Sequence, residues 1–235
     1  MTEVGGVNFR VVAAGGVPGG RLLRSGDSTA FTAAQSENLV AELGLRTVVD
    51  LRSPAEIDRY GPPLALVGAG VRWLSLPLDG YPRESVSARR PGVGDRVEYL
   101  RAILTSSAPG RWAALVAGLA EVAAEPFLLT CHFGKDRTGV AVMLALALAD
   151  ASEEDIAADY AAGAADLAAN VDRFQDKWIR RGHSREDYLG RMRTSPKTAI
   201  EWLSWMRRTY GGAEAALVAA GAAPADVARL RGVLS

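Results

Sequence analysis

Apolar residues occur in the first half of the chain as short runs that predict buried strands. Such runs cover 47–51, 71–76 and 127–130, with a shorter segment at 21–24. Apolar positions with helical spacing lie between them, most clearly over 29–43. Strands that alternate with helices predict an α/β fold with a central, mostly parallel sheet flanked by helices.

The second half of the chain has a different pattern, because helical spacing continues from residue 137 almost to the end. This pattern predicts a helical C-terminal portion. Two further helices are expected at about 96–105 and 110–123. Prolines and glycines between about 80 and 95 predict a lid loop. We interpret residues 1–235 as one domain, since this length can bury a full core.

The charges of the chain are balanced, with 27 basic and 27 acidic residues. Proteins that bind nucleic acids or membrane surfaces through a general basic field have an excess of one sign. We therefore expect no nucleic-acid partner. Any preference for an anion must come from a local group of residues.

Cysteine and histidine are rare in this chain, which has only Cys131, His132 and His183. One cysteine excludes an internal disulfide, and three such residues are too few for a typical Cys/His zinc site. We therefore expect neither a metal nor an organic cofactor. Cys131 is then either a core thiol or a reagent.

No targeting or membrane segment is predicted. The first residues lack the basic and apolar regions of a secretory signal. The longest apolar run, 140–149, is shorter than the roughly 20 residues that span a membrane. We expect a cytoplasmic protein without stable membrane insertion, with secretion that needs no signal peptide as the alternative.

The segment most informative about chemistry is 130–139, Thr-Cys-His-Phe-Gly-Lys-Asp-Arg-Thr-Gly, between a predicted strand and an apolar helix. A turn at this place presents backbone N–H groups at the positive end of a helix, which favours an anion. Arg137 follows Cys131 by six residues and can hold two phosphate oxygens over the same hollow. The same environment stabilises a thiolate. The pattern predicts a cysteine nucleophile that faces a bound phosphate.

This segment resembles the signature of the protein tyrosine phosphatases, Cys-x5-Arg followed by Ser or Thr. Residues 134–139 resemble the atypical bacterial branch, which has Gly-Lys-Asp-Arg-Thr-Gly. Blocks at 8–10, 22–25, 43–52 and 229–234 resemble the family in the same order, so the resemblance covers about 8–234. It implies a cysteine-phosphatase-like fold. Enzymes of this branch act on phosphotyrosine, phosphoserine or phosphothreonine, and phosphoinositides.

The resemblance also implies roles for the loop residues. It makes Cys131 the nucleophile, Arg137 the phosphate clamp and Thr138 the hydroxyl that stabilises the cysteine as leaving group. The phosphate-binding loop comprises His132, Phe133, Gly134, Lys135, Asp136, Arg137 and Thr138. His132 could orient the thiolate, contact the substrate or face solvent.

The first step also needs an acid to protonate the departing oxygen. The candidates are Asp136 in the loop, which we favour slightly, and Asp79 after the strand at 71–76. Asp50 is expected to order the end of its strand and to pair with a nearby arginine. The arginines at 83, 89, 90 and 96 are expected to form a solvated face, with steering of an anionic substrate as the alternative.

Three positions depart from the family pattern. Most relatives have histidine before the nucleophile, where this chain has Thr130. His132 and Phe133 occupy positions that are often small or neutral. In relatives the block Asn-Phe-Arg usually continues with Asp, whereas Val11 follows Arg10 here.

The function predicted from these residues is a cysteine-dependent phosphatase that hydrolyses phosphate monoesters through a phosphocysteine. Its expected partners are a phosphorylated protein, a lipid headgroup or a small molecule, and the oligomeric state stays open. One alternative is a phosphatase of a small metabolite such as a nucleotide or sugar phosphate. Another is an inactive phosphate-binding pseudophosphatase, although such a binder needs Arg137 but not the Cys131 thiol.

Overall fold

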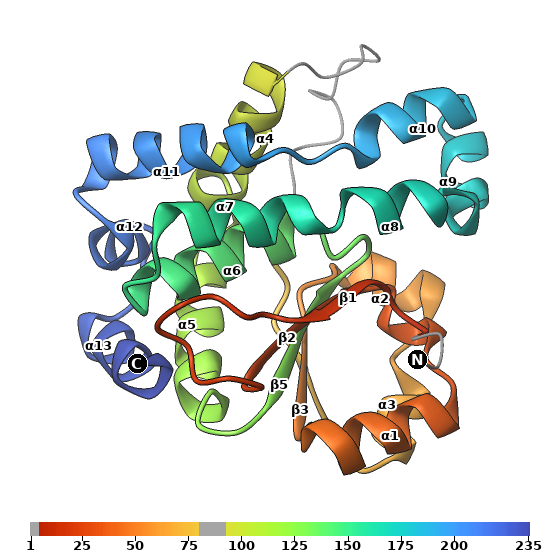
Figure 1. Ribbon diagram of the computed structural model, residues 1–235, viewed down its shortest axis with the longest axis horizontal. Coiled ribbons are helices and arrows are strands. Elements are labelled where there is room, and N and C mark those ends of the chain that lie inside the picture. The colour runs from red at the N-terminus through yellow and green to blue at the C-terminus, as the bar shows by residue number, and fades with distance from the viewer. Residues whose placement is uncertain (1–4, 80–92) are drawn as a thin grey trace.

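The computed structural model describes residues 5–79 and 93–235, without the side chains of residues 93–95. It contains a five-stranded sheet surrounded by helices (Figure 1). The strands are β1 (Val7–Val11), β2 (Leu22–Gly26), β3 (Thr47–Asp50), β4 (Arg72–Ser75) and β5 (Phe127–Cys131). Their order is β1-β2-β5-β3-β4; only β1 is antiparallel to its neighbour, and the other pairs are parallel. The predicted, mostly parallel sheet is therefore confirmed.

The helices before β5 are short or of medium length. They are η1 (Ser28–Ala30), α1 (Ala33–Leu43), α2 (Pro54–Tyr60), α3 (Leu64–Gly68), α4 (Val93–Thr105) and α5 (Arg111–Val122). Ser53 caps α2, accepting a hydrogen bond from the Glu56 amide while Glu56 accepts one from the Ser53 amide. Most of the predicted lid, at 80–92, lies outside the described residues, and α4 begins at Val93, within its last part.

The part of the chain after β5 is helical, as predicted. It contains α6 (Arg137–Leu148), α7 (Glu153–Ala162), α8 (Ala164–Ala169), η2 (Val171–Phe174), α9 (Gln175–Arg180), α10 (Arg185–Met192), α11 (Pro196–Tyr210), α12 (Ala213–Ala219) and α13 (Pro224–Leu234). No described helix is long and apolar enough to cross a membrane.

The two faces of the sheet bury different cores. Successive side chains of a strand point to opposite faces, so Leu129 of β5 joins the core beneath α5 and α6, whereas Leu128 joins the core beneath α1 and α3. A third core lies under α8, α9 and α10 and includes Phe174 and Trp178. In Figure 1, α7 to α11 extend across one end of the sheet. The loop after β5 emerges at this end.

Candidate active site

Cys131 lies where three parallel strands end together. It is the last residue of β5, which runs between β2 and β3, and it pairs in register with Gly26 of β2. Its neighbour Thr130 pairs with Asp50 of β3. The carboxyl ends of parallel strands are the usual place for a ligand site in an open α/β sheet. The Cys131 side chain is buried, with 2% of its surface exposed.

The loop after Cys131 is held from outside by donors to its carbonyl groups. The Asp27 amide donates to the carbonyl oxygens of Cys131 and His132, both at 3.1 Å. Asn8 Nδ2 and Arg24 Nη2 donate to the Gly134 carbonyl oxygen at 2.7 and 2.8 Å. In a trans peptide the next N–H points opposite to the carbonyl. The amides of residues 132, 133 and 135 therefore point away from this scaffold, an arrangement that can bind an anion.

Two glycines allow the loop to approach β2 closely. Gly134 has a φ of +60°, and a Cβ on it would lie 2.4 Å from the Gly26 nitrogen. A Cβ on Gly26 would lie 2.3 Å from the Phe133 carbonyl carbon. No side chain fits at either position without a backbone shift, because backbone atoms meet here on both sides.

An ion-pair network supports this scaffold. The Asp159 carboxylate of α7 pairs with Arg24 and, at 2.8 Å, with Arg10. Burial raises the pKa of Asp159, but the charges of Arg24 and Arg10 outweigh it and hold that pKa below its usual range. Asp159 thus supplies a carboxylate to the N-terminal block, which lacks the usual Asp after Arg10. Sequence reasoning missed this role, since Asp159 is distant in the chain.

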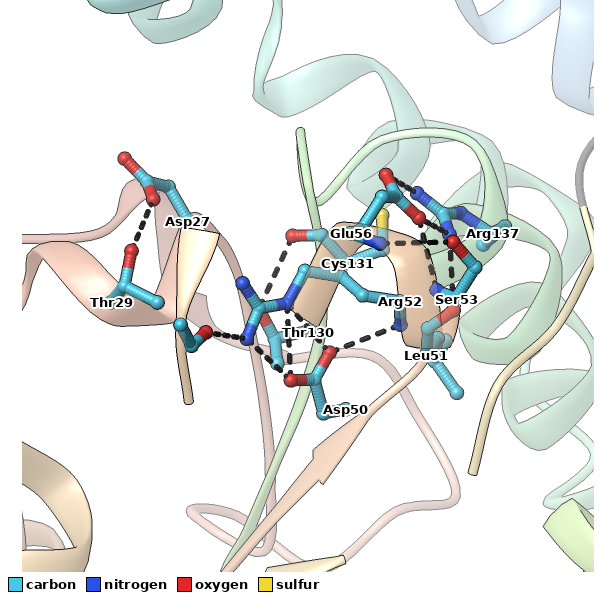
Figure 2. Close-up of polar contacts among 11 residues, drawn as sticks. Asp27, Thr29, Asp50, Leu51, Arg52, Ser53, Glu56, Thr130, Cys131 and Arg137 are labelled. Atoms are coloured by element: carbon cyan, nitrogen blue, oxygen red, sulfur yellow. Dashed lines mark hydrogen bonds and ion pairs between the residues drawn. The ribbon is translucent and has the colours of Figure 1, made fainter. Parts of the chain in front are cut away.

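The Arg137 guanidinium is held by a carboxylate of α2. Glu56 receives two hydrogen bonds from it, Nη1 to Oε2 at 2.6 Å and Nη2 to Oε1 at 2.9 Å, and Leu51 O accepts a third at 3.1 Å. Figure 2 shows Glu56 and Arg137 facing each other beside Cys131. The Ser53 capping box in turn fixes Glu56. The contact between Glu56 and Arg137 was not predicted from the sequence, because the two residues are 81 positions apart.

These charges determine the protonation of both partners. Burial raises the pKa of Glu56, but the hydrogen bond and charge of Arg137 lower it well below its usual range. Burial lowers the pKa of Arg137, but interactions with Cys131 and Glu56 outweigh this effect and raise that pKa above its usual value, so the guanidinium stays charged. The positive charge is therefore fixed next to the cysteine.

Asp50 and Arg52 form a buried pair at the end of β3 (Figure 2). Arg52 Nε donates to Asp50 Oδ1 at 2.9 Å, and Arg52 Nη2 donates to Oδ2 at 2.6 Å. Both side chains are almost fully buried. The predicted role of Asp50 is confirmed, and the pair stabilises the turn between β3 and α2 that carries Glu56.

His132 and Phe133 turn into an aromatic cluster. The His132 ring lies 4.7 Å from Tyr60, 4.8 Å from Phe133 and 5.2 Å from Phe174, measured between ring centres. His132 is buried, so it does not face solvent. Burial, together with the positive charge of Lys177, lowers the pKa of His132 to about 2. The ring is therefore neutral near neutral pH.

Lys135 and Asp136 lie on the other side of the loop, next to α4. Lys135 Nζ donates to the Arg191 carbonyl oxygen at 2.7 Å and lies 3.1 Å from Asp136 Oδ1. Burial lowers the pKa of Lys135 to about 8. Arg96 Nη1 lies 3.8 Å from Asp136 Oδ1. Arg96 is buried, so its prediction as part of a solvated face was wrong; residues 83, 89 and 90 lie outside the described residues.

The remaining predicted site residues are Thr138 and Asp79. Thr138 is fully buried at the start of α6, and its hydroxyl has no hydrogen-bond partner within the described parts of the chain. Asp79 contacts the region before α5, where its Oδ2 accepts a hydrogen bond from the Ala108 amide at 2.9 Å and lies 3.6 Å from Arg111 Nε. None of these Asp79 partners belongs to the loop. Among described residues, no cluster of three potential His, Cys, Asp or Glu metal ligands occurs.

Comparison with known proteins adds a family to this geometry. The sequence model described as "Tyrosine phosphatase family" matches residues 3–235. A curated protein of Cupriavidus necator, provisionally named as a tyrosine-protein phosphatase, is 34% identical over 146 residues, which are 60% of this chain and 52% of that protein. The chain thus spans about half the length of this relative.

Two solved structures are also similar. The core catalytic domain of the PP-IP phosphatase SIW14 of S. cerevisiae is 19% identical, with a TM-score of 0.37, covering 79% of this chain and 96% of that one. TpbA of P. aeruginosa, solved in complex with pTyr, is 22% identical, with a TM-score of 0.34, covering 74% and 86%. At TM-scores this low, neither similarity supports a conclusion about this chain.

Proposed function

The chain belongs to the tyrosine phosphatase family, and on this premise we propose that it hydrolyses phosphate monoesters through a phosphocysteine on Cys131. One observation carries the proposal: the carbonyl groups of the loop are anchored from outside, while Arg137 is clamped by Glu56 next to Cys131. Loop amides and a fixed guanidinium can stabilise the oxygens of a transferring phosphoryl group.

In the first step the Cys131 thiolate attacks phosphorus, the S–P bond forms, and the P–O bond to the substrate breaks. The leaving oxygen takes a proton from an acid, for which Asp136 and Asp79 are the candidates. In the second step water attacks phosphorus and gives its proton to the conjugate base. The P–S bond then breaks, which releases inorganic phosphate and restores the thiolate. The buried Thr138 hydroxyl is proposed to stabilise the sulfur as it leaves.

The proposed substrates are phosphorylated proteins, lipid headgroups or small phosphorylated molecules. The arrangement of Asp136 supports it as the acid more than that of Asp79. Asp136 belongs to the loop itself, whereas the Asp79 carboxylate is bound at the start of α5.

Release of inorganic phosphate from phosphopeptides, nucleotides, sugar phosphates and phosphoinositides tests this function. The assay is run with EDTA, using wild type and Cys131→Ser. We expect turnover that persists in EDTA and disappears in the variant, because serine is a much weaker nucleophile at neutral pH. If no compound is turned over, the phosphatase proposal is wrong, and the chain is better described as a phosphate-binding protein.

A further inference from the structure

Lys177 of α9 stands at the edge of the loop, on the side of Phe133. Its Nζ lies 4.7 Å from the centre of the Phe133 ring, and Phe133 follows Cys131 by two residues. The chain has three lysines. Lys135 pairs with Asp136 and Lys197 with Glu201, whereas Lys177 has no carboxylate at ion-pair distance within the described residues.

Lys177 belongs electrostatically to the reaction centre. Burial is the main cause that lowers the pKa of Lys177 to about 7; the charges of Arg181 and Arg137 also lower it, while Glu56 and Cys131 act in the opposite direction. The Lys177 ammonium therefore interacts electrostatically with Cys131, with the Arg137 guanidinium and with Glu56, the carboxylate that binds this guanidinium. Its charge in turn lowers the pKa of His132.

The backbone that carries Lys177 is held in place. Its helical neighbour Arg180 donates to the Tyr60 hydroxyl at 2.8 Å, which ties α9 to α2. The Tyr60 ring contacts His132 in the loop. On the buried side, Phe174 and Trp178 anchor this segment in the third core. The helix that carries Lys177 is therefore fixed relative to the loop.

We propose that Lys177 is a specificity-determining residue that binds a second phosphate group of the substrate, next to the phosphate attacked by Cys131. This proposal rests on the proposed phosphatase function. A half-buried ammonium without a carboxylate loses its proton easily, and a ligand that supplies negative charge would keep it charged. The Phe133 ring compensates only in part, because a cation–π contact is weaker than a charge-assisted hydrogen bond.

The two cations of the loop itself already have partners. Arg137 is paired with Glu56, and Lys135 is enclosed by Asp136 and the Arg191 carbonyl. Arg181 also lacks a carboxylate at ion-pair distance among the described residues, but its Nη1 lies 3.4 Å from the Tyr188 hydroxyl, whereas Lys177 Nζ lies over the ring of the loop residue Phe133. A phosphate suits Lys177 better than a carboxylate, because a dianion brings more negative charge to the ammonium. Lysine also binds phosphate as a compact point charge. The ligand class is a compound with phosphates on neighbouring positions.

Binding to the Cys131→Ser protein tests the proposal by calorimetry, with two probes of equal charge. One is myo-inositol with phosphates on neighbouring carbons, and the other is its isomer with phosphates on opposite carbons. We expect the first to bind about tenfold more tightly, and Lys177→Met to remove this preference. Lys197→Met is the matched control, because Lys197 is exposed on α11 and leaves the preference intact.

The proposal is overturned if the Cys131→Ser protein binds the two isomers equally. It is also overturned if the preference persists in Lys177→Met with an unchanged Tm. The assay needs no turnover, so its outcome is independent of phosphate release by wild type. The lipid form is distinguished with phosphatidylcholine vesicles that contain a phosphatidylinositol bisphosphate with neighbouring ring phosphates. Tighter, Lys177-dependent binding to these vesicles than to the free headgroup identifies a lipid ligand; the reverse identifies a soluble one.

Discussion

Glu56 accepts hydrogen bonds from both terminal nitrogens of Arg137, at 2.6 and 2.9 Å, so α2, which precedes β5 in the chain, fixes the orientation of a guanidinium that follows β5. The contact joins the α2 capping box to the loop. Arg137 is thus oriented before any ligand arrives. A preorganised clamp loses little entropy when it binds a phosphate.

Replacement of Glu56 by Gln is expected to lower kcat/KM by up to about a hundredfold, because the guanidinium loses its bidentate partner and its fixed direction. Glutamine preserves the capping box, so the helix should remain. Steady-state kinetics and Tm of Glu56→Gln are compared with those of Asp58→Asn, an exposed position on the same helix. Equal activity of the two variants would show that the clamp does not position Arg137.

The free energy of unfolding should decrease in acid because of Asp159, so the protein becomes less stable. Its pKa is lower in the folded protein than the unfolded value of about 3.9, so the folded state favours the carboxylate. This stabilisation is present above the unfolded value and is lost as the pH falls through the folded one. Urea unfolding between pH 7 and 3 measures the effect.

Asp159→Ala should reduce this pH dependence and cost about 3–5 kcal/mol at pH 7, since it leaves the buried Arg24 without its partner. Asp155→Ala, in the same helix but away from this network, is the control. If the free energy of unfolding depends on pH identically in Asp159→Ala and wild type, Asp159 is not the source of the acid sensitivity.

Gly134→Ala should disrupt the loop. The position has a φ of +60°, which costs about 1–2 kcal/mol for a residue with a Cβ, and that Cβ would meet the backbone of β2. We expect a lower Tm and loss of phosphate binding. Gly190→Ala, in α10 with open space around it, should instead raise stability by about 0.5–1 kcal/mol. A stable, fully active Gly134→Ala protein would refute the close approach.

His132 should remain neutral across the working range of pH. Burial lowers its pKa to about 2, so its ring should not titrate between pH 4 and 8. NMR of the two histidine side chains checks this directly, with His132→Phe to assign the signals. A His132 midpoint near 6 would mean that the ring is exposed or paired with a carboxylate.

The two candidate acids can be separated by the leaving group. Loss of a general acid slows a poor leaving group more than a good one. The variant that lacks the acid should therefore lose about 10²–10⁴-fold on phenyl phosphate but much less on para-nitrophenyl phosphate. We expect this pattern for Asp136→Asn and not for Asp79→Asn. The opposite result would assign the role to Asp79.

The sequence by itself predicted the alternation of strands and helices, the helical C-terminal portion and the loop with Cys131 and Arg137 at its ends. These features are local, because period, capping residues and glycines act over a few neighbours. β1 was missed; its single antiparallel pairing and the left-handed Asn8 interrupt any alternating pattern. The resemblance to a family, borne by short motifs, was confirmed over residues 3–235.

Only the tertiary structure decided which distant side chains serve the loop. Asp159 supports it from α7, Glu56 clamps Arg137 from α2, and Lys177 reaches it from α9. Arg96 became a buried partner of Asp136 rather than a solvated residue. The sequence does not show which charged residues will pair, because pairing depends on how packed helices bring distant residues together in the fold. The loop with Cys131 and Arg137 could therefore be predicted from the sequence, whereas the charged residues that support this loop could not.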